Sequence, residues 1–285
     1  MDESIVNFIL NDINRRKEQS NTVIQATNDF IPIDYKINNN GFRGPEFEKN
    51  NELLILGCSF THGQGLPQEY IWADILSKKL NMSYSNLGFG GDSAIGQISK
   101  AFYYFKNIGK PKIIVALFPS NRMLVPNVKD KLVSHNLHGE VRDSLFINQI
   151  SLEDGEFKKY AKSPYRPEDI FPQELAFLYE RIMLDMLEQY CETNDIKLFW
   201  SCWDFKYQYS LYHFIEKENQ GYHKNYCYLE SVFHEEEKKI CHEEYRSHEL
   251  FKIAADRLQN FSPHWGIHRN IHIADEFYDY IAKKI

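Results

Sequence analysis

The sequence predicts an α/β fold in which helices cover a parallel sheet. Two observations predict it: short apolar runs alternate along the chain with segments of helical periodicity, and loops with glycine or small polar residues follow these runs. Parallel strands need crossover connections of this kind, and such crossovers are right-handed. The chain has 285 residues, 43% of them hydrophobic and 26% charged. This composition is ordinary for a globular protein, and the length allows one large domain or two small ones.

The predicted strands of the sheet are short apolar runs bounded by turn residues, as is typical of buried strands. In chain order they are residues 53–56, 84–87, 113–118 and 196–200. A shorter strand at 35–37 precedes them and leads into the turn Asn38-Asn-Asn-Gly41, whose residues tolerate positive φ.

Helices are predicted where apolar residues recur every three or four positions. These segments are residues 1–17, 70–80, 94–105 and 173–193, and a last helix after residue 266. From 206 to 257 the sequence is rich in Tyr, His and Glu and is also predicted to be helical, with the charged run 234–239 on a solvated face.

Residues 123–170 interrupt this alternation with scattered proline, glycine and charged residues. We interpret the stretch as an insertion of the kind that can cover a site. The chain has no internal repeat and no low-complexity linker. We therefore expect one domain over residues 1–285, with an N-terminal helix and strand extension over 1–50 and insertions at 123–170 and 206–250.

Charge and composition exclude several classes of protein. The chain carries 33 basic and 40 acidic residues, a net charge of −7, which argues against a nucleic-acid-binding surface. Its longest apolar run is far shorter than the roughly 18 residues that span a bilayer. Asp2 and Glu3 stand where a signal peptide is positive, and the five cysteines include no Cys-x-x-Cys pair. We expect a cytoplasmic protein with reduced thiols that binds neither nucleic acid nor membrane; nothing in the sequence indicates its oligomeric state.

Polar residues follow the predicted strands, where ligands bind in open parallel sheets. Ser59 lies directly after the first run, Gly91 lies in a glycine-rich loop after the second, and Asn121 follows the third. His264 lies in a loop before the last helix. A serine nucleophile, backbone and amide donors for an oxyanion, and a histidine base are the groups that acyl transfer requires.

At these positions the sequence resembles the SGNH, or GDSL-type, hydrolase family. The residues that look like the family's four blocks are, in order, Gly57-Cys58-Ser59 with Gly63, then Gly91, then Asn121, then His264. The segment 38–44 is also similar to one that often precedes the first block. The resemblance runs in the right order from residue 38 to the end of the chain.

The resemblance implies a flavodoxin-like three-layer sandwich around a central parallel sheet, with helical insertions. It also implies a serine esterase or deacylase that hydrolyses an acyl ester on a small molecule or glycan through an acyl-enzyme. Ser59 would be the nucleophile and His264 the general base and then the general acid. The backbone N–H groups of Ser59 and Gly91 and the side-chain amide of Asn121 would form the oxyanion hole. No cofactor and no metal are implied.

Three positions depart from the family's pattern. Cys58 and Arg122 stand where the first and third blocks have aspartate. Phe261 stands three residues before His264, where the family has the aspartate that orients the imidazole. Asp256 takes that role if the residues between loop out; otherwise a Ser–His dyad operates, with a backbone carbonyl orienting the ring.

Other interpretations stay open. The same fold could act as an O-acyltransferase, or as a catalytically silent binding module, which the missing aspartate favours. Ser59 could be only the N-cap of a helix. The spacing of His264, His268 and His272 could place them on one helix face for a metal, although two further ligands are not evident.

Overall fold

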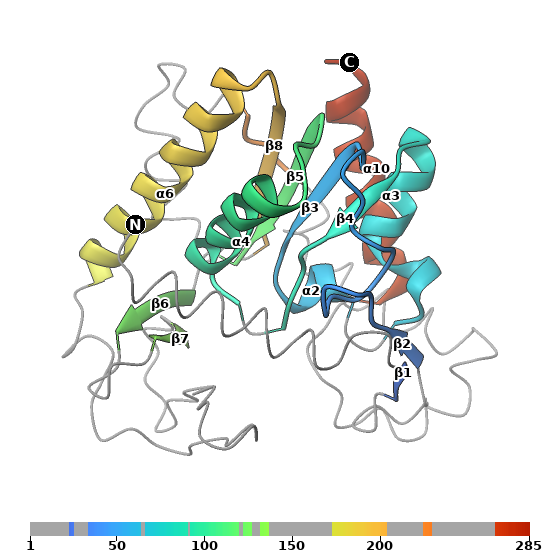
Figure 1. Ribbon diagram of the computed structural model, residues 1–285, viewed down its shortest axis with the longest axis horizontal. Helices are drawn as coiled ribbons and strands as arrows, with labels where there is room; N and C mark the ends of the chain where they lie inside the picture. Colours follow the sequence, from blue (N-terminus) through green and yellow to red (C-terminus); the bar gives the residue numbers. More distant parts are fainter. Residues whose placement is uncertain are drawn as a thin grey trace.

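The computed structural model describes residues 23–25, 34–63, 66–90, 92–119, 122–126, 132–136, 173–203, 225–229 and 266–285. Within them, four parallel strands form the central sheet in the order β4–β3–β5–β8 (Figure 1). Their bounds are Leu53–Gly57 for β3, Tyr84–Asn86 for β4, Ile113–Phe118 for β5 and Lys197–Cys202 for β8. The second strand of the sheet in the chain thus lies outside the first, which is the strand order of flavodoxin-like folds.

Helices cover both faces of this sheet (Figure 1). Their bounds are Trp72–Leu80 for α3, Ala94–Asn107 for α4, Gln173–Thr193 for α6 and Ile267–Ala282 for α10. Along β3, Leu54 and Leu56 pack with the core under α4 and α6, whereas Leu53 and Ile55 pack with the core under α3 and α10. Side chains of a strand alternate between the two faces, so this pattern confirms a three-layer α/β sandwich.

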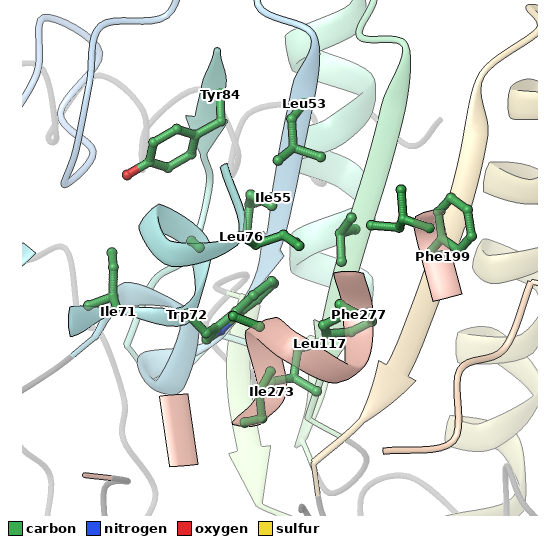
Figure 2. Close-up of a cluster of buried hydrophobic side chains, with 14 of the residues drawn as sticks. Leu53, Ile55, Ile71, Trp72, Leu76, Tyr84, Leu117, Phe199, Ile273 and Phe277 are labelled. Atoms are coloured by element: carbon green, nitrogen blue, oxygen red, sulfur yellow. The ribbon is translucent and has the colours of Figure 1, made fainter. Parts of the chain in front are cut away.

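The core under α3 and α10 is centred on two stacked aromatic rings (Figure 2). The ring centroids of Trp72 and Phe277 are 5.3 Å apart, and neither side chain is exposed. The backbone N–H of Trp72 donates to Asn270 Oδ1 at 2.9 Å, and Asn270 Nδ2 donates to the carbonyl of Gly266 at 2.9 Å. The start of α10 is thereby fixed against the start of α3.

The remaining described elements are short. They are the antiparallel pair β1 (Val23–Gln25) and β2 (Asp34–Lys36), the helical turns α2 (Ser59–His62) and η1 (Gln68–Tyr70), and the antiparallel pair β6 (Arg122–Pro126) and β7 (Leu132–Asn136). The second pair lies at the start of the predicted insertion at 123–170, of which residues 127–131 and 137–170 lie outside the described part.

The strands and helices predicted around the sheet are confirmed, two of them to the residue, at 113–118 and 173–193. The helix predicted over 70–80 begins at Trp72, because the residues before it form the η1 turn. The helix predicted over 1–17 lies outside the described residues. No helix within the described ranges has the length and hydropathy to cross a membrane.

The prediction of helix over 206–257 is wrong for residues 225–229, the part of it that the structure describes. Tyr226 forms a parallel bridge with Trp200 of β8, where the Trp200 N–H donates to the Asn225 carbonyl at 2.9 Å and the Cys227 N–H donates to the Trp200 carbonyl at 2.7 Å. β8 lies at the edge of the four-stranded sheet, so its outer backbone groups need partners. An extended segment supplies them, and helical periodicity in the sequence could not reveal this.

Candidate active site

Ser59 lies immediately beyond the carboxyl end of β3, one of the two inner strands of the sheet. It is the first residue of the short helix α2, and the residue in the N-cap position is Cys58. No side-chain hydrogen bond caps this helix. Ser59 is buried, and its Oγ lies 3.9 Å from the Sγ of Cys58. The alternative in which Ser59 serves only as an N-cap is therefore wrong, and the neighbouring Cys58 is buried.

The backbone before and after Ser59 turns sharply. Gly57 has φ +154°, and a Cβ there would collide with Thr61 Oγ1. The N–H groups of Thr61 and His62 both donate to the Cys58 carbonyl, at 3.1 and 2.9 Å. The first N–H groups of a helix have no acceptor within it. The N–H of Ser59 is one of these, as an oxyanion donor must be.

The loop after β4 packs directly on α2. A Cβ on Gly88 would lie 2.7 Å from the His62 nitrogen, so only glycine allows this approach. Asn86, the last residue of β4, donates from Nδ2 to the Thr61 carbonyl at 3.2 Å and accepts from the Gly88 N–H at 2.8 Å. The start of the glycine-rich loop, at Asn86 and Gly88, is thus hydrogen-bonded to and packed against the turn that contains Ser59.

A buried arginine holds the other end of α2. Arg43 is 1% exposed, and its Nη1 donates to the carbonyls of His62 at 3.1 Å and Gly63 at 2.5 Å, while Nη2 donates to the Leu66 carbonyl. The guanidinium lies 4.0 Å from the ring centroid of Tyr35. Burial lowers the pKa of Arg43 to about 10, so the side chain remains charged at neutral pH. Its charge is balanced by carbonyl dipoles and an aromatic face.

The turn predicted at Asn38-Asn-Asn-Gly41 lies just before Arg43 in the chain and positions it. Asn38 Oδ1 accepts from the N–H groups of Asn40 and Phe42, both at 3.0 Å, and Gly41 has φ +77°. Sequence reasoning singled out the segment 38–44 by its resemblance but missed the role of Arg43. A charged residue directly after the apolar Phe42 was the only local signal of this role.

A second buried polar group, Asp92, is connected through Gln97 to the start of the Ser59 turn. The carboxylate of Asp92 accepts hydrogen bonds from Gln97 Nε2 and from Lys100 Nζ, and both charged side chains are under one tenth exposed. Gln97 Oε1 accepts from the Gly57 N–H at 3.0 Å. Sequence reasoning missed these three residues, although a lysine among the apolar positions of α4 was a visible signal.

The structure places Ser59 but does not describe the other predicted site residues. Gly91, Asn121, His264 and Asp256 all lie outside the described part of the chain. Their described neighbours are Asp92, Pro119 and Gly266. The oxyanion-hole and general-base assignments therefore stay predictions.

The metal alternative gains no support. His268 and His272 lie one turn apart on α10, and His272 is exposed. Within the described ranges, no three His, Cys, Asp or Glu side chains gather in a way that could hold a metal ion. His264, the remaining member of the proposed triplet, lies outside those ranges.

Comparison with known proteins reveals only loose similarity. No family model matches the chain, and no curated protein matches it by sequence. Among solved structures, a psychrotrophic esterase from Pseudoalteromonas sp. is similar at 12% identity and TM-score 0.46, over 82% of this chain and 98% of that one. An acetyl xylan esterase from Butyrivibrio proteoclasticus has 13% identity and TM-score 0.43, over 85% and 66% of the chains. A member of the lipolytic G-D-S-L family from Veillonella parvula has 13% identity and TM-score 0.37, over 81% and 98%.

Proposed function

We propose that this protein is a serine hydrolase of the SGNH type that cleaves an acyl ester on a small molecule or glycan. The placement of Ser59 carries the proposal. It stands at the carboxyl edge of a parallel sheet, in a turn held by Gly57, Gly88 and Arg43, and its hydroxyl does not cap the helix. The order of the sequence blocks from residue 38 to His264 supports the same assignment.

In the proposed reaction, Ser59 Oγ attacks the carbonyl carbon of the ester while His264 accepts the hydroxyl proton. The carbonyl oxygen becomes an oxyanion that the N–H groups of Ser59 and Gly91 and the amide of Asn121 stabilise. The bond to the leaving alcohol then breaks, and His264 returns its proton to that oxygen. Water attacks the resulting acyl-enzyme with His264 as base, releasing the carboxylic acid and restoring Ser59.

The first experiment treats the folded protein with a fluorophosphonate probe and measures intact mass and the labelled peptide. We expect one probe per chain on Ser59 and none in Ser59→Ala. In His264→Ala, labelling should slow by about 100-fold or more, because the hydroxyl loses its base. Ser77→Ala is the matched control. This buried serine lies on α3, not in the turn that carries Ser59, and its hydroxyl donates to the Met82 carbonyl. Its loss should leave labelling of Ser59 unchanged.

Absence of labelling on Ser59 in the folded wild type would contradict the proposal and favour a silent binding module. With labelling established, acyl transfer to an added sugar that exceeds hydrolysis would replace the hydrolase with an O-acyltransferase. An Asp256→Ala variant separates the two ways of orienting His264. Unchanged turnover would indicate a dyad, whereas a triad acid should cost on the order of 1,000-fold or more in turnover.

A further inference from the structure

The backbone of Gly57, two residues before Ser59, is hydrogen-bonded through both its N–H and its carbonyl. Its N–H donates to Gln97 Oε1 at 3.0 Å, and its carbonyl accepts from the Phe89 N–H at 3.1 Å. Gln97 lies in the second turn of α4 and is not exposed. Phe89 in the loop after β4 and Gln97 on α4 therefore fix the two peptide groups that flank Gly57, where the Ser59 turn begins.

The amide of Gln97 is itself fixed by a buried carboxylate. Its Nε2 donates to Asp92, which also accepts from Lys100 Nζ and, at 3.0 Å, from the Ser93 N–H. A Cβ on Gly96 would collide with Asp92 Oδ1, so the glycine makes room for the carboxylate. With Nε2 committed to Asp92, Gln97 can present only its oxygen to Gly57.

Such a network is rigid for a physical reason. Its members are buried, and hydrogen bonds to an ionised group are shorter and stronger than neutral ones. Removing one member leaves desolvated partners unsatisfied, which is costly in a low-dielectric interior. The backbone at Gly57 is therefore held more rigidly than the hydrogen bonds of the sheet alone would hold the end of β3.

We propose that Gln97, held by Asp92 and Lys100, is a positioning residue for the oxyanion hole. Through the backbone of Gly57 it fixes the start of the turn that presents the Ser59 N–H. It therefore acts through Gly57 and not on the reacting atoms. The inference rests on the proposed serine hydrolase function and adds to it residues that the sequence blocks do not include.

The test uses Gln97→Met, which keeps the length of the side chain but removes both hydrogen bonds. With p-nitrophenyl acetate as substrate, we expect kcat to fall about 10- to 100-fold, the size of effect that a small misplacement of catalytic groups produces. KM should stay unchanged, because the misplaced donors stabilise an oxyanion that forms only in the transition state.

A second readout distinguishes positioning from general destabilisation. When a phosphonate labels Ser59, its phosphoryl oxygen occupies the position of the oxyanion, so the ³¹P chemical shift of the adduct reports the donors around it. We expect this shift to change in Gln97→Met. The control is Tyr104→Phe on the same helix, which removes a buried hydroxyl 3.0 Å from Ser85 Oγ, at the other end of α4. It should lower stability while leaving kcat and the ³¹P shift as in the wild type.

If Gln97→Met does not fold, Asp92→Asn carries the test, because it keeps the shape of the side chain while weakening the hold on Gln97. We expect a smaller fall in kcat, again with KM unchanged and the ³¹P shift altered. The inference is overturned if Gln97→Met, or Asp92→Asn where Gln97→Met does not fold, matches Tyr104→Phe in kcat and ³¹P shift. A folded wild type that shows neither labelling nor turnover would instead overturn the proposed function, and this inference with it.

Discussion

Two buried carboxyl groups lie on the same side of the sheet, and their surroundings differ. Asp92, just before α4, accepts hydrogen bonds from a backbone N–H, an amide and an ammonium group. Glu180, on α6, is 2% exposed, and neither of its carboxyl oxygens has a hydrogen-bond partner in the part of the chain that the structure describes. Burial raises the pKa of Glu180 well above its ordinary value.

The comparison teaches that burial alone does not decide what a carboxyl group does. A buried charge is tolerated where partners replace the water it has lost, and a group without partners neutralises instead. Asp92 has a cation within reach and can organise the backbone around Gly57. Glu180 has none within the described ranges, and burial raises its pKa, which favours the neutral acid over an anchoring charge.

The largest expected effect makes Asp92 resemble Glu180 by removing its cation. Lys100→Met should lower the free energy of unfolding by about 3–5 kcal/mol, because it leaves a buried carboxylate unpaired. Urea denaturation followed by circular dichroism measures this. The control is Lys112→Met, whose ammonium is 2.6 Å from Glu52 but whose side chain is 72% exposed. That substitution should change stability by no more than about 0.5 kcal/mol.

A smaller effect is expected when both charges are removed together. The double variant Asp92→Asn with Lys100→Met should lose only about 1 kcal/mol, because replacing a whole buried ion pair is far less damaging than breaking it. A double-mutant cycle with the two single variants gives the coupling between the side chains. Strict additivity of the two single losses would show that the ion pair does not anchor this region.

The smallest expected effect is a gain. Burial raises the pKa of Glu180 in the folded protein well above the ordinary value that it has in the unfolded chain, so stability is lost as the pH rises above that ordinary value. Glu180→Gln cannot ionise in either state. It should be more stable than the wild type by about 1 kcal/mol at neutral pH, with the difference vanishing near pH 4, below the ordinary glutamate pKa of about 4.3. Denaturation curves at both pH values measure it, and a loss of stability at neutral pH would show that Glu180 has a partner.

Local pattern predicted most of the fold. The apolar run of β5 and the periodic apolar face of α6 identify their elements to the residue, because hydrophobic periodicity and turn chemistry act over a few positions. The same reasoning placed Ser59 at the end of the first strand of the sheet. It failed at 225–229, because pairing with the edge of β8 depends on a segment more than twenty residues away.

The sequence by itself determined the strands of the sheet, the helices between them and the position of Ser59, the proposed nucleophile, since all of these follow from short-range patterns. Only the tertiary structure decided which partners support the turn that carries Ser59. Arg43 reaches carbonyls 19 to 23 residues further along, and Gln97 reaches the Gly57 N–H across 40 residues. These contacts arise from sheet order and helix packing, and no local pattern encodes them, because each residue alone is an ordinary polar side chain.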